Sequence, residues 1–413
     1  MIQFKKYRLL AAALVVLCAF VSCSKRGESS VDAAVDGARS VGSGAAVSFA
    51  DLKKSGSMSL RYATQFSVDY YELPDGSASG SASGGAGVSG SAAAYKLVRV
   101  ANDGSFLIVP ENAPVPSDIP PGIKPLRQPL DHVYVVATAA MDVINVTGSL
   151  GNILFSGTKA KDWSIPEVTA AMEAGKILYA GKYSAPDYEL LTASGCDLAI
   201  ENTMVYHKPE VKEKLEELGF PVLVEYSSYE PHPLGRLEWI KLYGVLFGCE
   251  DAAAGYYADQ ISRIEPIMAK EPSGLSVAFF YVNNNGAVNV RKPNDYVVKM
   301  ITLSGGKYAL EDVLVEEDNA LSTMNMMMED FYVSCVNSDI LIYNGTIDTE
   351  FSSLDDLFAK SGLFRDFAAV KSGKVYFVSK DFYQQTTGLA DFMEDLYKVL
   401  NGEEDNLTYL VKL

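Results

Sequence analysis

The sequence predicts an α/β protein made of two Rossmann-like lobes with central sheets, joined by a single long α-helix, with a ligand cleft between the lobes. Three observations support this fold class. Short apolar runs alternate with helix-like segments, an order that indicates parallel sheets covered by helices. One long amphipathic segment, 249–272, separates two blocks of this kind. The two blocks also repeat the same order of elements.

The joining segment follows an apolar stretch, 233–247, which predicts a buried helix that ends at Gly248. Glu250 then opens a second helix, because an acid in the first turn interacts favourably with the helix dipole. Apolar residues follow at three- and four-residue spacing as far as Met268, and they form one stripe. We therefore expect a rigid helix over 250–269, long enough to connect two lobes.

Short apolar runs mark the strands of both lobes. We place the first lobe at 58–248, with a flexible Gly/Ser-rich insertion at 75–94, and the second lobe at 273–413. Prolines break the segment 110–129 repeatedly, so it is expected to be irregular. The strand-like runs are Ser59–Tyr71, Tyr95–Val100, Val133–Thr138, Ile177–Tyr179, Leu198–Ile200, Val222–Val224, Val277–Val282, Ile340–Tyr343 and Val375–Val378. The helix-like segments outside the linker are Ala140–Gly148, Tyr188–Ala193, Pro209–Leu218, Tyr296–Ser304, Met326–Val336, Leu354–Lys360 and Gly388–Leu400.

Residues 1–22 have the pattern of a lipoprotein signal peptide. A basic start precedes an apolar run of about 13 residues, too short to span a bilayer of about 30 Å. The run ends in Phe-Val-Ser-Cys, which resembles a bacterial lipoprotein box, so Cys23 is the predicted lipidation site; an ordinary signal peptide with a chance cysteine is the alternative. Residues 23–57, rich in Ser, Gly and Ala at their start, are expected to be a flexible tether. We expect an exported protein, lipid-anchored to a bacterial membrane at the periplasm or cell surface.

Composition and motifs exclude several function classes. The net charge of −17 argues against a nucleic-acid partner. The thiols beyond Cys23, namely Cys196, Cys249 and Cys335, show no CxxC spacing, so neither a disulfide framework nor a zinc ribbon is indicated. With three histidines, one of them (His132) before its strand, direct metal-ion binding by the protein is not expected. No GxSxG, HExxH or Walker A motif is present, so we expect a binding protein and not an enzyme.

The internal repeat places acidic residues at matching positions. The first copy, 186–202, and the second, 327–345, each contain a short helix, an acid and a buried strand. Each helix begins near a glutamate, and each strand follows an aspartate. These four acids are Glu189 and Glu329 on the helices and Asp197 and Asp339 before the strands. Stabilisation of the helix dipole is the simplest reason for the glutamates.

From about 59 to 399 the chain resembles the class III periplasmic binding proteins, the receptors of ABC importers for ferric siderophores, haem and cobalamin. The matching pieces, in order, are YATQFSVDYY, PDYELLTASGCDLAI, LEELGFPVLVEYSSYEPHPLGRLEWIKLYGVLFG, EDFYVSCVNSDILIYN and FRDFAAVKSGKVYFV. The resemblance implies two lobes joined by one helix, a cleft that holds an iron chelate, and delivery to a membrane permease and its ATPase. It also implies that Glu189 and Glu329 engage the permease, with Glu329 at a less regular spacing. A monomer with no cofactor other than the lipid on Cys23 is expected.

Ligand contacts are expected where loops leave the carboxyl ends of the strands. Aromatic, imidazole and cationic side chains in these loops suit a bulky anionic chelate. A histidine or tyrosine would instead serve as an axial ligand if the ligand were haem. His232 and Arg236 have a structural alternative, in which they fix the helix that starts at Pro233 and Arg236 pairs with Glu230. The candidate ligand-binding residues are Tyr206, His207, Tyr229, His232, Arg236, Arg291, Lys292 and Tyr383.

The function predicted from these features is the capture of a ferric siderophore and its delivery to an ABC permease. Haem or a corrinoid such as cobalamin, bound by the same fold, is the first alternative. A surface scavenger or adhesin lipoprotein that has no permease partner is the second alternative. The metal chelate itself is a small-molecule cargo, and the membrane is contacted through the lipid.

Overall fold

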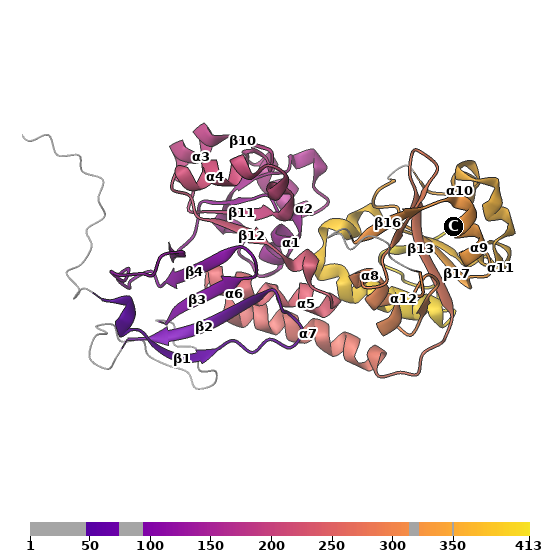
Figure 1. The fold of residues 1–413 in the computed structure, drawn as a ribbon, viewed down its shortest axis with the longest axis horizontal. Helices are drawn as coiled ribbons and strands as arrows, with labels where there is room; N and C mark the ends of the chain where they lie inside the picture. Colours follow the sequence, from indigo (N-terminus) through magenta and orange to yellow (C-terminus); the bar gives the residue numbers. More distant parts are fainter. Residues whose placement is uncertain (1–46, 74–93, 314–321, 349–350) are drawn as a thin grey trace, which may run out of the picture. The chain divides into compact units, whose positions relative to one another are not determined.

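The computed structural model describes residues 47–73, 94–313, 322–348 and 351–413, and Ala45–Leu413 form one compact unit (Figure 1). The predicted signal peptide, the lipidation site Cys23 and nearly all of the Gly/Ser-rich insertion 75–94 lie outside the described residues. Within the described part of the chain there are three sheets of five or more strands and one two-stranded ladder.

The first sheet contains five strands in chain order, antiparallel except for the parallel pair β4 and β5. Phe66 and Val68 of β2 are buried and alternate with exposed Ser67, as expected for a strand with one face on the core. Val98 and Phe106 pack into the same core. The strands are β1 (Lys53–Ser57), β2 (Phe66–Glu72), β3 (Tyr95–Val100), β4 (Gly104–Val109) and β5 (Ile123–Arg127).

Two sequence-based expectations are corrected by this sheet. The tether was expected to extend over 23–57, but Lys53–Ser57 is strand β1, preceded by a turn that Ser48 caps. The segment 110–129 was expected to be irregular, but Ile123–Arg127 pairs with β4. Both strands lie at the edges of the sheet; β1 is polar and largely exposed, and β5 has a proline at its centre. Their stability comes from pairing with a neighbour, which an apolar pattern does not reveal.

The second sheet has five parallel strands in the order β12-β11-β6-β7-β8. Strands β7 and β8 lie on one side of β6, whereas β11 and β12 lie on the other. The direction in which the chain adds strands to the sheet therefore reverses between β6 and β11. In open α/β sheets, ligands bind beside such a switch point, at the carboxyl ends of the strands. The strands are β6 (Val133–Val135), β7 (Ile153–Ser156), β8 (Leu178–Tyr179), β11 (Leu198–Asn202) and β12 (Val222–Glu225). The helices are α1 (Thr138–Val146), α2 (Pro166–Glu173), α3 (Tyr188–Ser194) and α4 (Pro209–Glu217). The two-stranded ladder pairs β9 (Gly181–Lys182) with β10 (Ala185–Pro186).

Helices α5 (Pro233–Glu238), α6 (Ile240–Phe247) and α7 (Glu250–Met268) connect this sheet to the next one. The predicted single helix over 233–247 is divided at Trp239, where α5 ends and α6 begins. Helix α7 packs closely on α6: a Cβ added at Gly244 would lie 2.8 Å from the Cβ of Ala253. The predicted joining helix is therefore present, one residue shorter than expected.

The third sheet has the order β16-β14-β13-β17-β18-β19, and β15 also pairs with β13. Strands β13, β15, β17 and β18 run parallel, whereas β14, β16 and β19 are antiparallel to their neighbours. The strands are β13 (Ser276–Val282), β14 (Val288–Arg291), β15 (Lys307–Tyr308), β16 (Thr323–Met326), β17 (Ile340–Tyr343), β18 (Val375–Val378) and β19 (Leu410–Lys412). The helices are α8 (Tyr296–Leu303), α9 (Met328–Cys335), α10 (Leu354–Lys360), α11 (Ala368–Ser372) and α12 (Leu389–Leu400).

The internal repeat predicted from the sequence is present in three dimensions. Asp197 precedes β11, and its Oδ2 accepts the backbone N–H groups of Asp131 and His132 at 3.1 and 3.0 Å, just before β6. Asp339 precedes β17, and its Oδ2 accepts the N–H and hydroxyl of Ser276, both at 2.8 Å, at the start of β13. In each of these two sheets, two strands of a parallel pair are thus connected at their starts. The aspartate before the strand that comes later in the chain accepts hydrogen bonds at the start of the earlier strand and fixes it.

The predicted α/β fold class with two parallel-centred sheets and one joining helix is confirmed. The cleft between the lobes stays a prediction.

Candidate functional site

The first-lobe candidates follow β11 and β12 at their carboxyl ends. Tyr206 and His207 lie in the short 3-10 helix Thr203–His207 after β11, and Tyr229 lies in Ser227–Tyr229 after β12. All three side chains are exposed. The chain geometry therefore agrees with the switch-point argument, which places solvent-accessible polar and aromatic groups at this edge of the sheet.

Three tyrosines form a small aromatic cluster at this edge. The ring of Tyr226 lies 6.2 Å from that of Tyr206 and 5.5 Å from that of Tyr229, measured between centroids. Tyr206 and Tyr229 are 42% and 43% exposed, whereas Tyr226 is buried. Tyr226 was not among the sequence candidates, although its position directly after β12 could have identified it. The cluster offers two accessible aromatic faces to a planar or apolar group.

His232 has a structural role. It is the N-cap residue of α5, where its Nδ1 accepts the backbone N–H of Leu234 at 3.2 Å. Its ring stacks on Tyr62 with a centroid distance of 4.4 Å. Burial, together with the positive charges of Lys299 and Arg61, lowers the pKa of His232 to about 4. The imidazole is therefore neutral at physiological pH, and Nδ1 is already engaged.

Arg236 lies in α5 and contacts the second-lobe helix α8. Its guanidinium carbon is 4.1 Å from the ring centroid of Tyr296, a cation–π distance. Its Nε is buried and has no hydrogen-bond partner among the described residues. The expected alternative, an ion pair with Glu230, does not form. The Glu230 carboxylate instead accepts backbone N–H groups of Thr64 and Gln65, and the indole N–H of Trp239.

Arg291 approaches the same tyrosine from the second lobe. It is 5% exposed, because it lies at the end of strand β14 and not in a loop as expected. Its guanidinium carbon is 6.0 Å from the Tyr296 ring, and its Nη1 is 3.6 Å from the carboxylate of Asp295. Burial lowers the pKa of Arg291, but Asp295, Tyr296 and a hydrogen bond with Tyr383 raise it more, so the net shift is upward. Arg291 is thus a largely compensated, buried cation.

Tyr383 and Lys292 are placed beside this group. Tyr383 lies in the 3-10 helix Lys380–Gln384 after β18 and is 53% exposed. Lys292 follows β14, is partly buried, and donates its backbone N–H to the carbonyl of Ser322.

Five of the eight candidates fall into two sets, and His207, His232 and Lys292 belong to neither. The first set, which we call the arginine–tyrosine group, contains Arg236, Tyr296, Arg291 and Tyr383. The second set is the tyrosine cluster Tyr206, Tyr226 and Tyr229. Within the described chain, no aromatic or hydrogen-bond contact joins the two sets. Tyr296 was missed because it was assigned to the predicted helix Tyr296–Ser304, whereas the candidates were sought in loops; Asp295 caps this helix in the structure.

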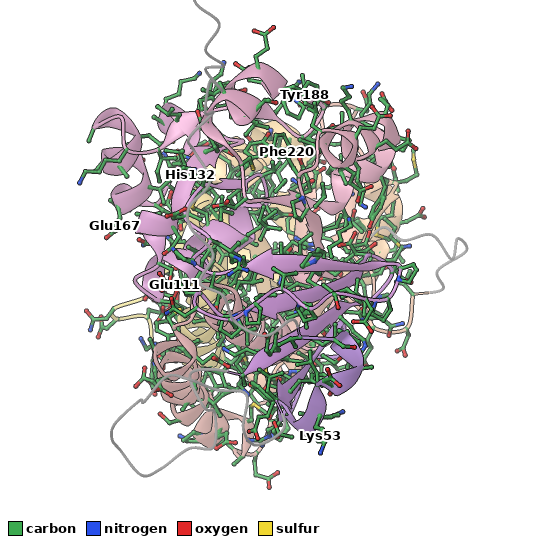
Figure 2. The ribbon with its side chains drawn as sticks, turned by 90° about the vertical axis from the view of Figure 1, so that its left-hand side faces the viewer. Lys53, Glu111, His132, Glu167, Tyr188 and Phe220 are labelled. Atoms are coloured by element: carbon green, nitrogen blue, oxygen red, sulfur yellow. The ribbon has the colours of Figure 1, made fainter. Side chains whose placement is uncertain are left out.

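The two candidate docking acids are exposed at equivalent positions. Glu189 lies in the first turn of α3 and Glu329 in the first turn of α9. Helix α3 precedes β11 and α9 precedes β17, the strands that follow the matching aspartates. Tyr188, the residue before Glu189, lies near the upper edge of the view in Figure 2. Val333, on the same short helix as Glu329, is 77% exposed.

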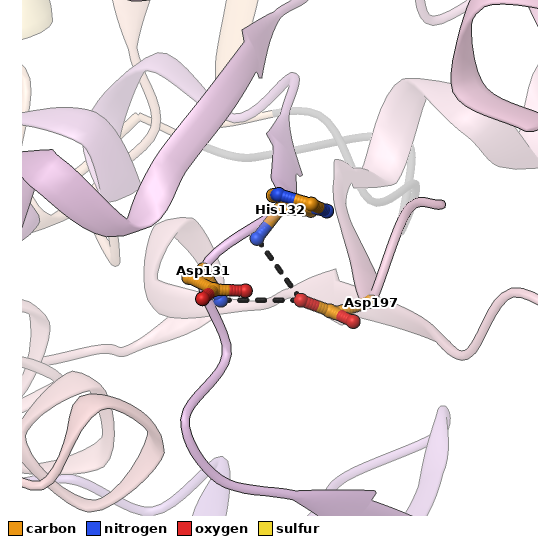
Figure 3. Close-up of side chains that lie close together, drawn as sticks. All are labelled: Asp131, His132 and Asp197. Atoms are coloured by element: carbon orange, nitrogen blue, oxygen red, sulfur yellow. Dashed lines mark hydrogen bonds between the residues drawn. The ribbon is translucent and has the colours of Figure 1, made fainter. Parts of the chain in front are cut away.

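Asp131, His132 and Asp197 form the one group of three potential metal ligands found among the described residues (Figure 3). Their ligand atoms lie within 4.8 Å of one another. The group lies at the amino end of β6, opposite the edge that holds the other candidates. Asp197 is already used as an acceptor for two backbone N–H groups, and the His132 Nδ1 is 3.2 Å from the carbonyl of Gly195. These contacts explain the cluster as a brace for the start of the strand.

Comparisons with known proteins add relatives and structural neighbours. Two uncharacterized lipoproteins of Methanocaldococcus jannaschii are each 24% identical to the chain. One match spans 308 residues, 70% of this chain and 70% of the relative, and the other spans 337 residues, 77% and 82%. No protein-family model matches the chain. The prediction of a lipoprotein agrees with the names of both relatives.

Solved structures resemble the chain in fold. A periplasmic binding protein from Veillonella parvula has a TM-score of 0.53 at 17% identity, covering 66% of this chain and 92% of its own. The periplasmic haem-binding protein of Vibrio cholerae has a TM-score of 0.52 at 15% identity, covering 64% and 98%. The petrobactin-binding protein of Bacillus subtilis has a TM-score of 0.51 at 14% identity, covering 65% and 92%. The neighbours are binding proteins, in agreement with the expectation that this chain is not an enzyme.

None of the described helices combines the length and the apolar composition that a membrane crossing needs.

Proposed function

The chain has the fold of the class III periplasmic binding proteins, and from this premise we propose that it is the substrate-binding lipoprotein of an ABC importer. It is exported, held on the membrane by a lipid on Cys23, and binds a metal chelate between its two parallel-sheet lobes. It then delivers the intact chelate to a permease. The fold of the haem- and petrobactin-binding neighbours supports this class of cargo.

The observation that carries the proposal is the state of Arg236. Its charge faces an aromatic ring of the other lobe, its Nε lacks a partner, and it takes part in none of the ion pairs between described residues. A buried donor without a partner costs free energy, so this arrangement is favourable when a ligand supplies an acceptor. A ferric siderophore carries anionic oxygens that meet this requirement. Arg291, Tyr383 and Lys292 are the proposed contacts beside it.

The tyrosine cluster and the imidazoles define the alternatives within the same fold. Exposed Tyr206 and Tyr229 suit the planar part of an aromatic ligand, and His207 follows Tyr206 directly in the chain. Accessible tyrosines and His207 make haem the second candidate, whereas His232 is not a suitable ligand. Its Nδ1 already accepts the Leu234 N–H, so its Nε2 carries the proton of the neutral imidazole. Cobalamin is the remaining alternative.

Glu189 and Glu329 are the proposed contacts with the permease. Both carboxylates are exposed, and they occupy equivalent positions in the two halves of the repeat. An acid on each lobe would engage two basic side chains of a membrane partner. A surface scavenger that has no permease would not need this pair, so the two acids favour the importer over the scavenger.

Titration of the purified chain tests the ligand-binding proposal. The probes are haemin, an iron(III)–catecholate siderophore and cyanocobalamin, each followed by absorption and tryptophan fluorescence. We expect one probe to bind and Arg236→Ala to weaken it by about 10- to 100-fold, because a charge-assisted bond contributes about 1.5–3 kcal/mol. Arg365→Ala is the matched control, since Arg365 also stacks on an aromatic ring, Phe358 at 4.0 Å, but is exposed. Equal affinities of the wild type and the Arg236→Ala variant would show that the site lies elsewhere.

A further inference from the structure

Segment 380–388 belongs to the second lobe but is held by the first. It contains the 3-10 helices Lys380–Gln384 and Thr386–Gly388, between β18 and α12. The Gln384 carboxamide oxygen accepts the N–H and the hydroxyl of Ser164, at 2.8 and 2.9 Å, and its nitrogen donates to the carbonyl of Asp162 at 2.8 Å. One side chain of this segment thus makes three hydrogen bonds to the region between β7 and α2.

Asp142 holds the same segment at a second point. Its Oδ2 accepts the backbone N–H of Thr387 at 2.7 Å and the Thr387 hydroxyl at 2.8 Å. Asp142 is 4% exposed and Thr387 is 8% exposed, so water does not compete freely for these bonds. The two residues are 245 positions apart in the chain, and Asp142 comes from α1, the helix that follows β6.

Tyr383 connects these attachments to the arginine–tyrosine group. It is the neighbour of Gln384 in the chain, and its hydroxyl is hydrogen-bonded to Arg291. Fixing residues 384 and 387 therefore fixes the backbone from which Tyr383 projects. A side chain with 53% exposure would otherwise have considerable freedom at this place.

We infer that Asp142 is a positioning residue, whose buried bonds to Thr387 latch segment 380–388, and with it Tyr383, to the first lobe. When the latch closes, the carboxyl group of Asp142 passes from water into a buried site, and when the latch opens it returns to water. The latch is consequently linked to protonation. This inference extends beyond ligand identity, because the contact exists whatever the cargo is.

The direction of the linkage follows from the surroundings of Asp142. Burial raises its pKa to about 6 from an ordinary value of 3.8, against the two Thr387 bonds, which lower it. The other titratable groups that act on it are Glu167 of α2, Tyr256 of α7 and Tyr409 before β19, none of which supplies a positive charge. The latched state therefore binds the proton more tightly than the open state, and acidification favours latching.

The size of the effect can be stated as a fold-change. If the open state has the ordinary value, the latching equilibrium should be about tenfold more favourable at pH 5 than at pH 7. His232, whose pKa is lowered to about 4, titrates below this range, and comparison of variants assigns the response to Asp142.

Hydrogen exchange of the full mature chain tests the inference. The readouts are the backbone amides of Thr387 and Ser164, whose acceptors are Asp142 and Gln384, with rates corrected for intrinsic exchange. In the wild type we expect about tenfold stronger protection of both amides at pH 5 than at pH 7. Asp142→Asn keeps an amide oxygen as acceptor but cannot titrate, so its protection should be the same at both pH values.

Two further variants separate positioning from a purely local contact. Asp142→Ala should remove protection at Thr387 and also at Ser164, because the whole segment is released. Gln384→Ala should lose protection at Ser164 but retain the pH response at Thr387. A wild-type pH response in Asp142→Asn would overturn the inference, and so would unchanged Ser164 protection in Asp142→Ala. If Asp142→Ala did not fold, the Asp142→Asn comparison would still decide.

Discussion

Glu201 tests how burial of a carboxyl group changes the pH dependence of folding stability. It lies on β11 between β6 and β12, is 0% exposed, and neither carboxylate oxygen has a hydrogen-bond partner among the described residues. It shares a face of the strand with Ala199, which pairs with Tyr134. The Tyr134 hydroxyl is not available as a donor, because it already donates to the carbonyl of Gly181 at 2.8 Å. Burial accordingly raises the pKa of Glu201 to about 8.

The free energy follows from the shift in pKa. In the unfolded chain Glu201 ionises near its ordinary value of 4.5, whereas in the folded chain it keeps its proton until about pH 8. Its protonated form is tolerated below pH 4.5, and folding stability is lost as the pH rises from there toward 8. One pKa unit corresponds to about 1.4 kcal/mol, so the loss at pH 7 is about 3 kcal/mol.

Glu201→Met removes the ionisable group while it keeps a similar volume. We expect the variant to be more stable than the wild type at pH 7, by about 3 kcal/mol. The gain should increase by about 1.4 kcal/mol for each pH unit between pH 5 and 8. Urea unfolding of both proteins at pH 5, 6, 7 and 8 measures it, with Glu213→Met on the exposed face of α4 as the control.

A pH-independent difference would refute this reasoning. It would mean that Glu201 has an ordinary pKa in the folded chain, and hence a partner such as an internal water or cation that satisfies its charge. A large loss of stability in Glu201→Met would lead to the same conclusion.

Three further predictions concern the repeat and its acids. Asp339→Ala should destabilise the chain by about 1–3 kcal/mol in urea unfolding, because the start of β13 loses its acceptor, and Asp339→Asn should restore part of this. The double variant Glu189→Ala, Glu329→Ala should bind ligand like the wild type but abolish uptake in cells, and normal uptake would exclude permease docking by these acids. Gly345→Ala should lower stability by about 1–3 kcal/mol or more in thermal unfolding, since the new Cβ would lie 2.5 Å from the carbonyl oxygen of Val378; an unchanged midpoint would contradict the steric argument.

The elements with the best-predicted bounds include two buried strands and two helices. Strands β17 and β18 and helix α10 have the predicted bounds, and α7 differs by one residue. Buried parallel strands must be apolar on both faces, and helices have recognisable caps, so both produce a local signal. Strands β1, β4, β5, β7 and β14 were missed. Strand β1 is polar and depends on a partner that is distant in the chain. Strands β4 and β7 are apolar and largely buried, so a local signal was present there and was not used. Strand β16 was also missed, and its last residue, Met326, was assigned to the helix that follows.

The candidate site shows the same limit. Loop positions at the carboxyl ends of strands indicated Tyr206, Tyr229 and Arg236 correctly as residues at that edge. The stacking of Arg236 on Tyr296 joins residues 60 positions apart and has no local pattern. Likewise, Glu230 was available as a partner for Arg236 in sequence, but its oxygens are occupied by backbone donors from residues 64 and 65. Competition between acceptors is decided by the tertiary fold.

Helix α7 holds the two halves of the chain together by contacts that do not depend on an unbroken backbone. It packs on α6 of the first half and on α12 of the second, where Arg263 forms ion pairs with Asp391 and Glu394. The segment after it, 270–274, is exposed on every residue. A protease cut there would leave both fragments bound through α7 and through segment 380–388. The cut chain should therefore stay assembled although its backbone is no longer continuous, because these contacts do not depend on the peptide bonds of 270–274.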